Sequence, residues 1–173
     1  MALTELNVKA IDKTIEAIKK TTGDRFQMSV FINDFGYTGR IHTCETAACI
    51  AGWACLANLP RDERIRQTIS SNWDKMGADV LGLSLYPHSA AHELFLLGAY
   101  DRDDKIVEIV KDIFSKFGLY YNRERTVLSN FDQLPERFRK QAAVNVLTIL
   151  KEMGKVDWVT ALEMAYKEYS NIL

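Results

Sequence analysis

Hydrophobic residues recur at helical spacing along most of the chain. Near its start, Val8, Ile11, Ile15 and Ile18 stand three or four positions apart, with charged residues between them. This spacing places the apolar side chains on one face of an α-helix. Comparable patterns, with helix start and stop signals, predict further helices within residues 45–58, 61–73, 73–83, 87–98, 101–118, 135–154 and 157–173.

Two stretches depart from the helical period. The segment 25–34 fits a short strand as well as a single helical turn, and residues 119–134 lack a helical pattern, so we expect them to be extended or loop. A Pro/Gly/Ser-rich linker or a fixed-period repeat that would divide the chain is missing from the sequence. We therefore predict one compact all-α domain over residues 1–173, with about seven or eight helices and room for one short extended segment.

Composition and charge narrow the functional classes. With 173 residues, 47% of them hydrophobic and 26% charged, the chain can bury one substantial core. The formal net charge of -1 supplies no global field for nucleic acid or an anionic membrane surface, so neither is an expected partner. The sequence has no signal-peptide pattern and no apolar run of the roughly 18 residues that a membrane span needs. We expect a soluble, cytoplasmic protein.

All three cysteines lie within HTCETAACIAGWACLA, residues 42–57. On one helix Cys44, Cys49 and Cys55 could not converge on a metal ion, and their spacings differ from those of zinc-binding cysteine pairs. We interpret them as small buried core residues of a helix that allows close packing at Gly52. In that helix, Thr43 or Thr46 would provide the N-cap, and Trp53 would fill a gap with its indole N–H bonded to an acceptor. No metal or cofactor is predicted.

An enzymatic alternative stays open. Cys44 follows His42 by two positions, near a predicted helix N-terminus that would lower a thiol pKa, although Glu45 opposes that shift. His88 and His92 are four positions apart, which puts two potential metal ligands on one helix face. A third ligand would have to come from elsewhere in the chain, with His42, Cys44 or Asp79 as the candidates. This alternative is a metal- or thiol-dependent enzyme. The simpler interpretation, which we favour, gives these histidines surface or capping roles.

Aromatic and basic residues alternate in YYNRERTVLSNF and RFRKQ. Such alternation also occurs in single-stranded nucleic-acid sites, so binding of that kind through residues 119–140 is a second alternative. Glu124 and Glu136 dilute the positive charge there, which weakens it.

Several motifs resemble those of a family of uncharacterised proteins from bacteria and their phages. The central motif of that family is C-G-T-x-A-C-I-A-G-x-A, which Cys44–Ala54 matches except that Glu45 replaces glycine. The family also shows F-x-M-S, a Leu-Gly-Leu helix that leads to Leu-Phe, and a helix that closes in Thr-Gly-x-Val-Asp-Trp. The matching residues here are Phe26, Met28, Ser29, Leu81, Gly82, Leu83, Leu94, Phe95, Gly154, Val156, Asp157 and Trp158, while Met153 replaces the threonine. The resemblance implies a shared fold and leaves the activity open.

Because no catalytic constellation assembles in the sequence, we favour a non-catalytic binding protein. By the resemblance it would be phage-encoded, and it would capture a host protein or a small nucleotide-like ligand. The candidate binding residues are His42, Tyr86, His88, His92, Tyr120, Tyr121, Arg123 and Arg125. The residues with predicted structural roles are Cys44, Thr46, Cys49, Gly52, Trp53, Asp157, which would cap the last helix, and Trp158, which would anchor it.

Overall fold

The computed structural model describes residues 6–21, 26, 32–34, 46–60, 73–83, 94–95, 104–125 and 127–171. Within these ranges lie seven α-helices: α1 (Val8–Lys20), α2 (Ile50–Asn58), α4 (Trp73–Leu81), α6 (Asp104–Lys116), α7 (Val127–Phe131), α8 (Glu136–Met153) and α9 (Trp158–Ser170). Two short strands, β1 (Ile32–Asp34) and β2 (Thr46–Ala48), pair antiparallel, with Asn33 opposite Ala47. The fold is mostly α, which confirms the predicted class.

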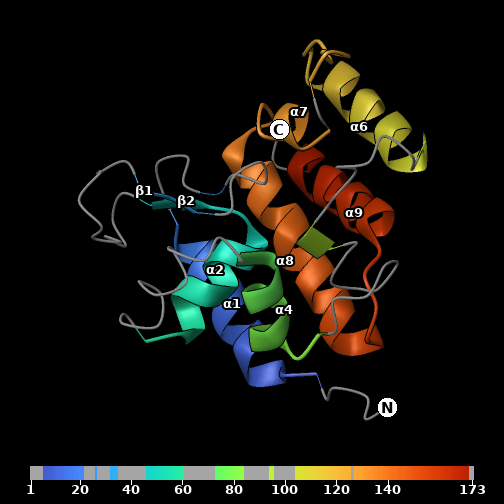
Figure 1. Ribbon diagram of the computed structural model, residues 1–173. Helices are drawn as coiled ribbons and strands as arrows, with labels where there is room; N and C mark the ends of the chain where they lie inside the picture. The colour runs from blue at the N-terminus through green and yellow to red at the C-terminus, as the bar shows by residue number, and fades with distance from the viewer. Residues whose placement is uncertain are drawn as a thin grey trace.

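The longest described helix, α8, lies between the helices α1 and α9 (Figure 1). It packs against both α1 and α9, while α2 packs against α1 and α4. At the end of the molecule drawn at the top of Figure 1, α6 contacts α7 and α9. Buried side chains from all seven helices join in one hydrophobic core. The helices therefore depend on one another for burial of their apolar faces.

The amphipathic helices form where the spacing predicts them. The buried face of α1 includes Ile11, Ile15 and Ile18, and the side chain of Asn7 accepts a hydrogen bond from the Ala10 backbone N–H at 3.1 Å as the N-cap. Helices α4, α6, α8 and α9 lie within predicted segments. The helix predicted over 61–73 lies outside the described residues, and of the one predicted over 87–98 only Leu94 and Phe95 are described, both helical and buried.

Helix α2 begins five residues later than predicted, because the sequence pattern indicated a helix from 45 to 58. Thr46 lies in β2 and does not cap the helix. The N-cap is Cys49, which has extended backbone angles and makes no capping hydrogen bond with its side chain. The prediction that Cys49 lies inside a helix is therefore wrong, although its predicted burial is confirmed.

The small residues of α2 permit close packing. Every residue from Ile50 to Leu56 is buried, including Gly52, and α4 comes so near that a Cβ added to Gly77 would lie 3.0 Å from the Ala51 Cα. Trp53 is buried, but no hydrogen-bond acceptor for its indole Nε1 occurs among the described residues. Close approach to α2 is confirmed at Ala51, whereas close packing at Gly52 itself stays a prediction and the expected partner of the indole is not found among the described residues.

The stretch 119–134 is not a strand in any of its described residues. Residues 119–125 form a loop, and helix α7 follows at Val127–Phe131. The extended residues occur instead in β1 and β2. A helix of five residues is too short to show a 3.6-residue period, which is why the sequence pattern did not indicate α7.

The last helix begins as predicted. Helix α8 ends at Gly154, whose left-handed φ of 68° favours glycine, and Asp157 is the N-cap of α9. The Asp157 carboxylate accepts hydrogen bonds from the Thr160 backbone N–H at 3.0 Å and the Thr160 hydroxyl at 2.7 Å. Trp158 is buried and packs edge-on against Phe131. Both predicted roles are confirmed.

Replacing Asp157 with alanine should lower the free energy of unfolding by about 1 kcal/mol, because the first turn of α9 loses its cap. Hydrogen bonds from Thr160 hold the pKa of Asp157 below its ordinary value of 3.8. The ionised carboxylate therefore adds stability above that value, and the contribution disappears as the pH falls through the lowered pKa. Urea unfolding of Asp157→Ala at several pH values checks this. Asp157→Asn, a comparable cap, should retain most of the stability, and equal losses in both variants would contradict the capping role.

Candidate functional site

The predicted binding residues divide into two groups. His42, Tyr86, His88 and His92, together with Cys44, lie outside the described residues. Tyr120, Tyr121, Arg123 and Arg125 are described and lie together on one loop, residues 119–125, which we call the 119–125 loop. In Figure 1 this loop lies at the top of the molecule, between the end of α6 and the start of α7.

The 119–125 loop starts from a firmly packed helix end. Gly118 has a φ of 67°, and the Leu119 backbone N–H donates to the Phe114 carbonyl at 2.9 Å, which closes the C-terminus of α6. One residue earlier, the Phe117 ring makes edge contacts with Phe138 and Tyr169. Aromatic contacts with α8 and α9 therefore fix the position at which the loop leaves the core.

The side chain of Asn130 forms hydrogen bonds with the backbone of the loop. It is 1% exposed, its Oδ1 accepts from the Asn122 backbone N–H at 3.0 Å, and its Nδ2 donates to the Asn122 carbonyl at 2.8 Å. The same Nδ2 also donates to the Arg125 carbonyl at 3.4 Å. In addition, Asn122 accepts from the Glu124 backbone N–H, which forms an Asx turn. Backbone hydrogen bonds to a buried amide thus determine the shape of the loop.

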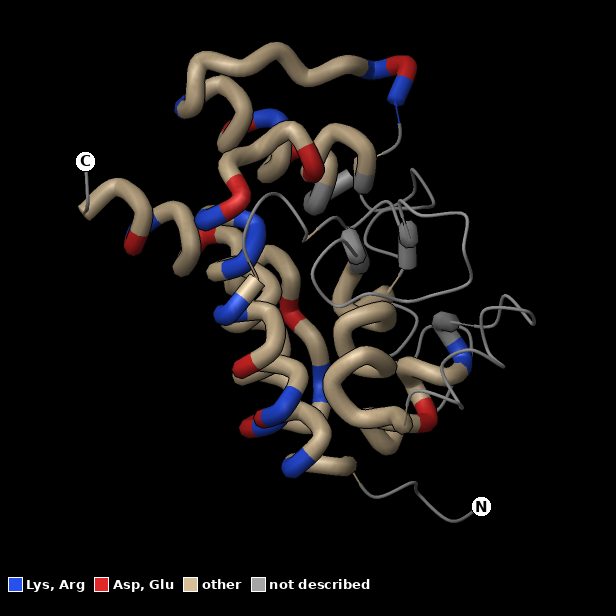
Figure 2. The backbone as a smooth tube through the Cα atoms, turned by 90° about the vertical axis from the view of Figure 1, so that its left-hand side faces the viewer, with Lys and Arg blue, Asp and Glu red and all other residues tan. Residues whose placement is uncertain are grey.

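The outer surface of the loop combines aromatic, apolar and cationic groups. Tyr120 is 85% exposed and Leu119 is 39% exposed. Tyr121 is half-buried, with its ring edge-on to Phe114 and the Lys111 ammonium 5.5 Å from the ring centroid. Arg123 and Arg125 are exposed on either side of Glu124. Figure 2 shows this turn as blue, red and blue segments at the upper end of the tube.

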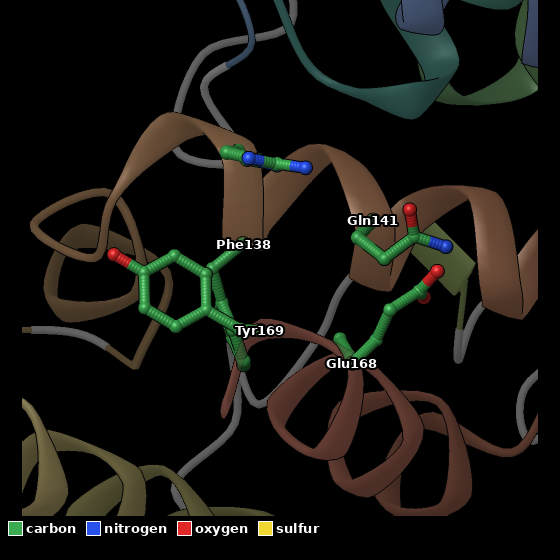
Figure 3. Close-up of a pocket in the computed structure, with 6 residues that line it drawn as sticks. Phe138, Gln141, Glu168 and Tyr169 are labelled. Carbon is green, nitrogen blue, oxygen red and sulfur yellow. The ribbon is translucent and has the colours of Figure 1, made fainter. Parts of the chain in front are cut away.

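A second surface feature is a groove between α8 and α9, lined by Arg137, Phe138, Gln141, Ala165, Glu168 and Tyr169. Its empty space is about 270 Å³ including the open side. The Gln141 and Glu168 side chains extend toward each other from the two helices (Figure 3). Gln141 Nε2 already donates to Asn145 Oδ1 at 2.9 Å, and Asn145 Nδ2 donates to the Ala161 carbonyl. The Asn145–Ala161 hydrogen bond ties α8 to α9, whereas the Gln141–Asn145 hydrogen bond lies within α8 and gives Gln141 a structural role.

Arg139 is a buried cation with a structural role. Its Nε donates to the Leu134 carbonyl at 2.9 Å, and its Nη1 donates to the Phe26 carbonyl. Nη1 also lies 3.9 Å from Oδ1 of the largely buried Asp132. The sequence had placed this residue in a basic, aromatic surface segment, but its guanidinium joins Phe26 to the start of α8. Arg139 is therefore not available for nucleic acid.

The described cysteines are buried, as predicted. Burial raises the pKa of the Cys49 thiol to about 11, although backbone hydrogen bonds from Gly52 and Ala51 act in the opposite direction. At neutral pH this thiol is protonated and a poor nucleophile. No group of three or more His, Cys, Asp and Glu side chains that could hold a metal ion occurs among the described residues, which do not include any of the histidines.

Sequence reasoning found the exposed residues of the loop but missed what supports them. Asn130 and Lys111 were not predicted, because both act through side-chain contacts eight and ten positions along the chain, at spacings that neither a helical nor a strand period indicates. The Asn122–Asn130 pair carries no recognisable motif. The groove residues on α9 were also missed, since Glu168 and Tyr169 follow an ordinary amphipathic pattern.

No family model, no curated protein and no solved structure matches this chain. The resemblance based on Cys44–Ala54 and Gly154–Trp158 therefore stays a prediction. In the part of the chain that the structure describes, no helix is both long and apolar enough to cross a membrane.

Proposed function

We propose that this protein is a non-catalytic binding protein that captures a protein partner through the 119–125 loop. The observation that supports the proposal is the 85% exposure of Tyr120 on a loop whose backbone is held by the buried Asn130. If the chain is phage-encoded, as the sequence resemblance implies, the partner would be a host protein.

The composition of the loop suits a protein interface. Tyrosine and arginine are enriched among the residues that contribute most to binding, and Tyr120 stands close to Arg123 and Arg125 in sequence. A tyrosine also has few rotatable bonds to immobilise. Because Asn130 orders the loop before any partner arrives, association loses less conformational entropy than it would with a flexible segment.

The enzymatic, nucleic-acid and small-ligand alternatives receive less support. The enzymatic alternative needs His42, Cys44, His88 or His92, which lie outside the described residues, and the described Cys49 is buried with a raised pKa. Nucleic-acid binding through residues 119–140 loses Arg139 to the core. A small nucleotide-like ligand would need a concave site, whereas Tyr120 projects from a loop.

A photo-crosslinking amino acid at position 120 tests the proposal directly. In lysate of the source cells, this variant should form a discrete adduct with one protein, and an excess of unlabelled wild-type protein should abolish it. Unlabelled Tyr120→Ala should compete poorly, because it lacks the exposed ring. The control carries the same photo-crosslinker at Met164, an exposed apolar residue of α9, and should not form that adduct. Identical adducts from both positions would contradict the assignment of the loop.

A further inference from the structure

We propose that the partner segment received by the 119–125 loop is acidic, with an apolar residue that packs on Tyr120. This inference rests on the proposed binding function of the loop and specifies the chemistry of the partner. It depends on the charge and geometry of the described side chains at this end of the molecule.

Among the described residues, the loop carries two cations and one anion, and a third cation lies against its Tyr121 ring. Arg123 and Arg125 are exposed, and Lys111 places a third positive charge over the Tyr121 ring. Glu124 is the single carboxylate of residues 119–125. On α6, the Asp112 carboxylate is paired with Lys116 at 2.8 Å, and the Lys116 ammonium lies over the Tyr166 ring of α9. Glu108 is exposed one turn before Lys111. This local excess of positive charge contrasts with the chain's net charge of -1.

Guanidinium groups match carboxylates particularly well. Their planar arrangement of N–H donors allows two parallel hydrogen bonds to one carboxylate, and such charge-assisted bonds are stronger than neutral ones. Neither Arg123 nor Arg125 forms an ion pair with another residue in the described ranges. Leu119 and Tyr120 supply the adjacent apolar surface, which suits a segment that combines aspartate or glutamate with an aliphatic or aromatic residue.

The aromatic geometry favours a protein segment over a single nucleic-acid strand. Sites for single strands stack successive bases on several open aromatic faces. Here Tyr120 is open, but the Tyr121 ring is half-buried between Lys111 and Phe114. Glu124 between the arginines would also repel the phosphates of a backbone that follows them. A single exposed ring with cations at separate positions nearby suits a protein segment in which acidic and apolar side chains alternate.

Selection from a library of random displayed peptides on the immobilised full-length protein tests the inference. The selected peptides should be enriched in Asp and Glu, with at least one apolar residue, and their binding should weaken as salt is raised. Fluorescence anisotropy of the labelled peptides should show about tenfold weaker binding to Arg123→Gln/Arg125→Gln, since each lost charge-assisted bond contributes appreciably. Tyr120→Ala should weaken the same peptides.

A matched control removes the same charge elsewhere. Lys9→Gln/Lys13→Gln changes two exposed lysines of α1 and should bind the peptides as the wild type does. Peptides that require Tyr120 but show no acidic enrichment, and that tolerate the double arginine change, would overturn the inference and leave the proposed function intact. Tighter binding of a labelled oligothymidylate than of the peptides would overturn it in favour of nucleic acid. If no Tyr120-dependent peptide emerges, the inference also fails, and crosslinking at position 120 decides the proposed function separately.

Discussion

Replacing Arg139 with leucine is expected to lower the free energy of unfolding by about 3–5 kcal/mol. The side chain is 2% exposed, and its guanidinium binds the Leu134 and Phe26 carbonyls and lies 3.9 Å from the Asp132 carboxylate. Leucine would fill part of the space but would remove the guanidinium donor from the two carbonyl oxygens and a nearby cation from Asp132. An unsatisfied buried acceptor carries its full desolvation cost, and a buried carboxylate without its cation costs more.

Urea unfolding monitored by circular dichroism measures this loss. Arg137→Leu is the matched control, because Arg137 is exposed on the same helix, and its effect should stay within about 0.5 kcal/mol. Arg139→Lys keeps the charge but not the forked geometry, so it should fall between the wild type and leucine. An Arg139→Leu protein that unfolds at the wild-type urea concentration would show that the buried guanidinium contributes little net stability.

Arg139 also shows why a buried cation is not predictable from the sequence. In RFRKQ, two arginines stand two positions apart, yet one is exposed and the other belongs to the core. The difference arises from the carbonyls of Phe26 and Leu134, and Phe26 is separated from Arg139 by more than a hundred positions. The free-energy cost of removing a charge from water normally keeps a charged residue at the surface. Only the assembled fold therefore reveals this exception.

The amphipathic helices were predictable because the pattern itself specifies them. In α1, the isoleucines at 11, 15 and 18 can be buried together only on a helix, and the Asp157 cap follows from a polar residue just before an apolar run. The start of α2 was not predictable in this way. Residues 46–48 are small and show neither helical nor alternating periodicity, so pairing with Ile32–Asp34 determines their structure.

The 119–125 loop illustrates both outcomes within one segment. The absence of a helical period over 119–134 predicted an extended or loop segment, and residues 119–125 are a loop, whose tyrosines and arginines were selected for their chemistry. Its ordering by Asn130 was not foreseen, because the hydrogen bonds involve backbone groups of residues 122 and 125 rather than a sequence motif. Sequence reasoning thus identified the exposed groups, and the structure identified what holds them in place.

Replacing Gly77 with leucine should destabilise the protein by about 1–3 kcal/mol or more, because it overpacks the closest described contact of a glycine in the core. An added Cβ would lie 3.0 Å from both Cα and Cβ of Ala51 and 3.2 Å from its carbonyl oxygen. These atoms belong largely to the backbone of α2, which is buried between α1 and α4 and has little freedom to move. The gain in helix propensity of about 1 kcal/mol over glycine does not offset separating the two helices.

Thermal unfolding of Gly77→Leu beside Asp79→Leu isolates the packing effect. Asp79 is an exposed residue of the same helix, so the control introduces the same side chain without meeting α2. For a domain of this size each kcal/mol shifts the melting temperature by about 2–4 °C. Gly77→Leu should therefore melt several degrees lower than Asp79→Leu. Equal melting temperatures would mean that α4 can move away from α2 at little cost, and that the small residues of both helices are not required for their close approach.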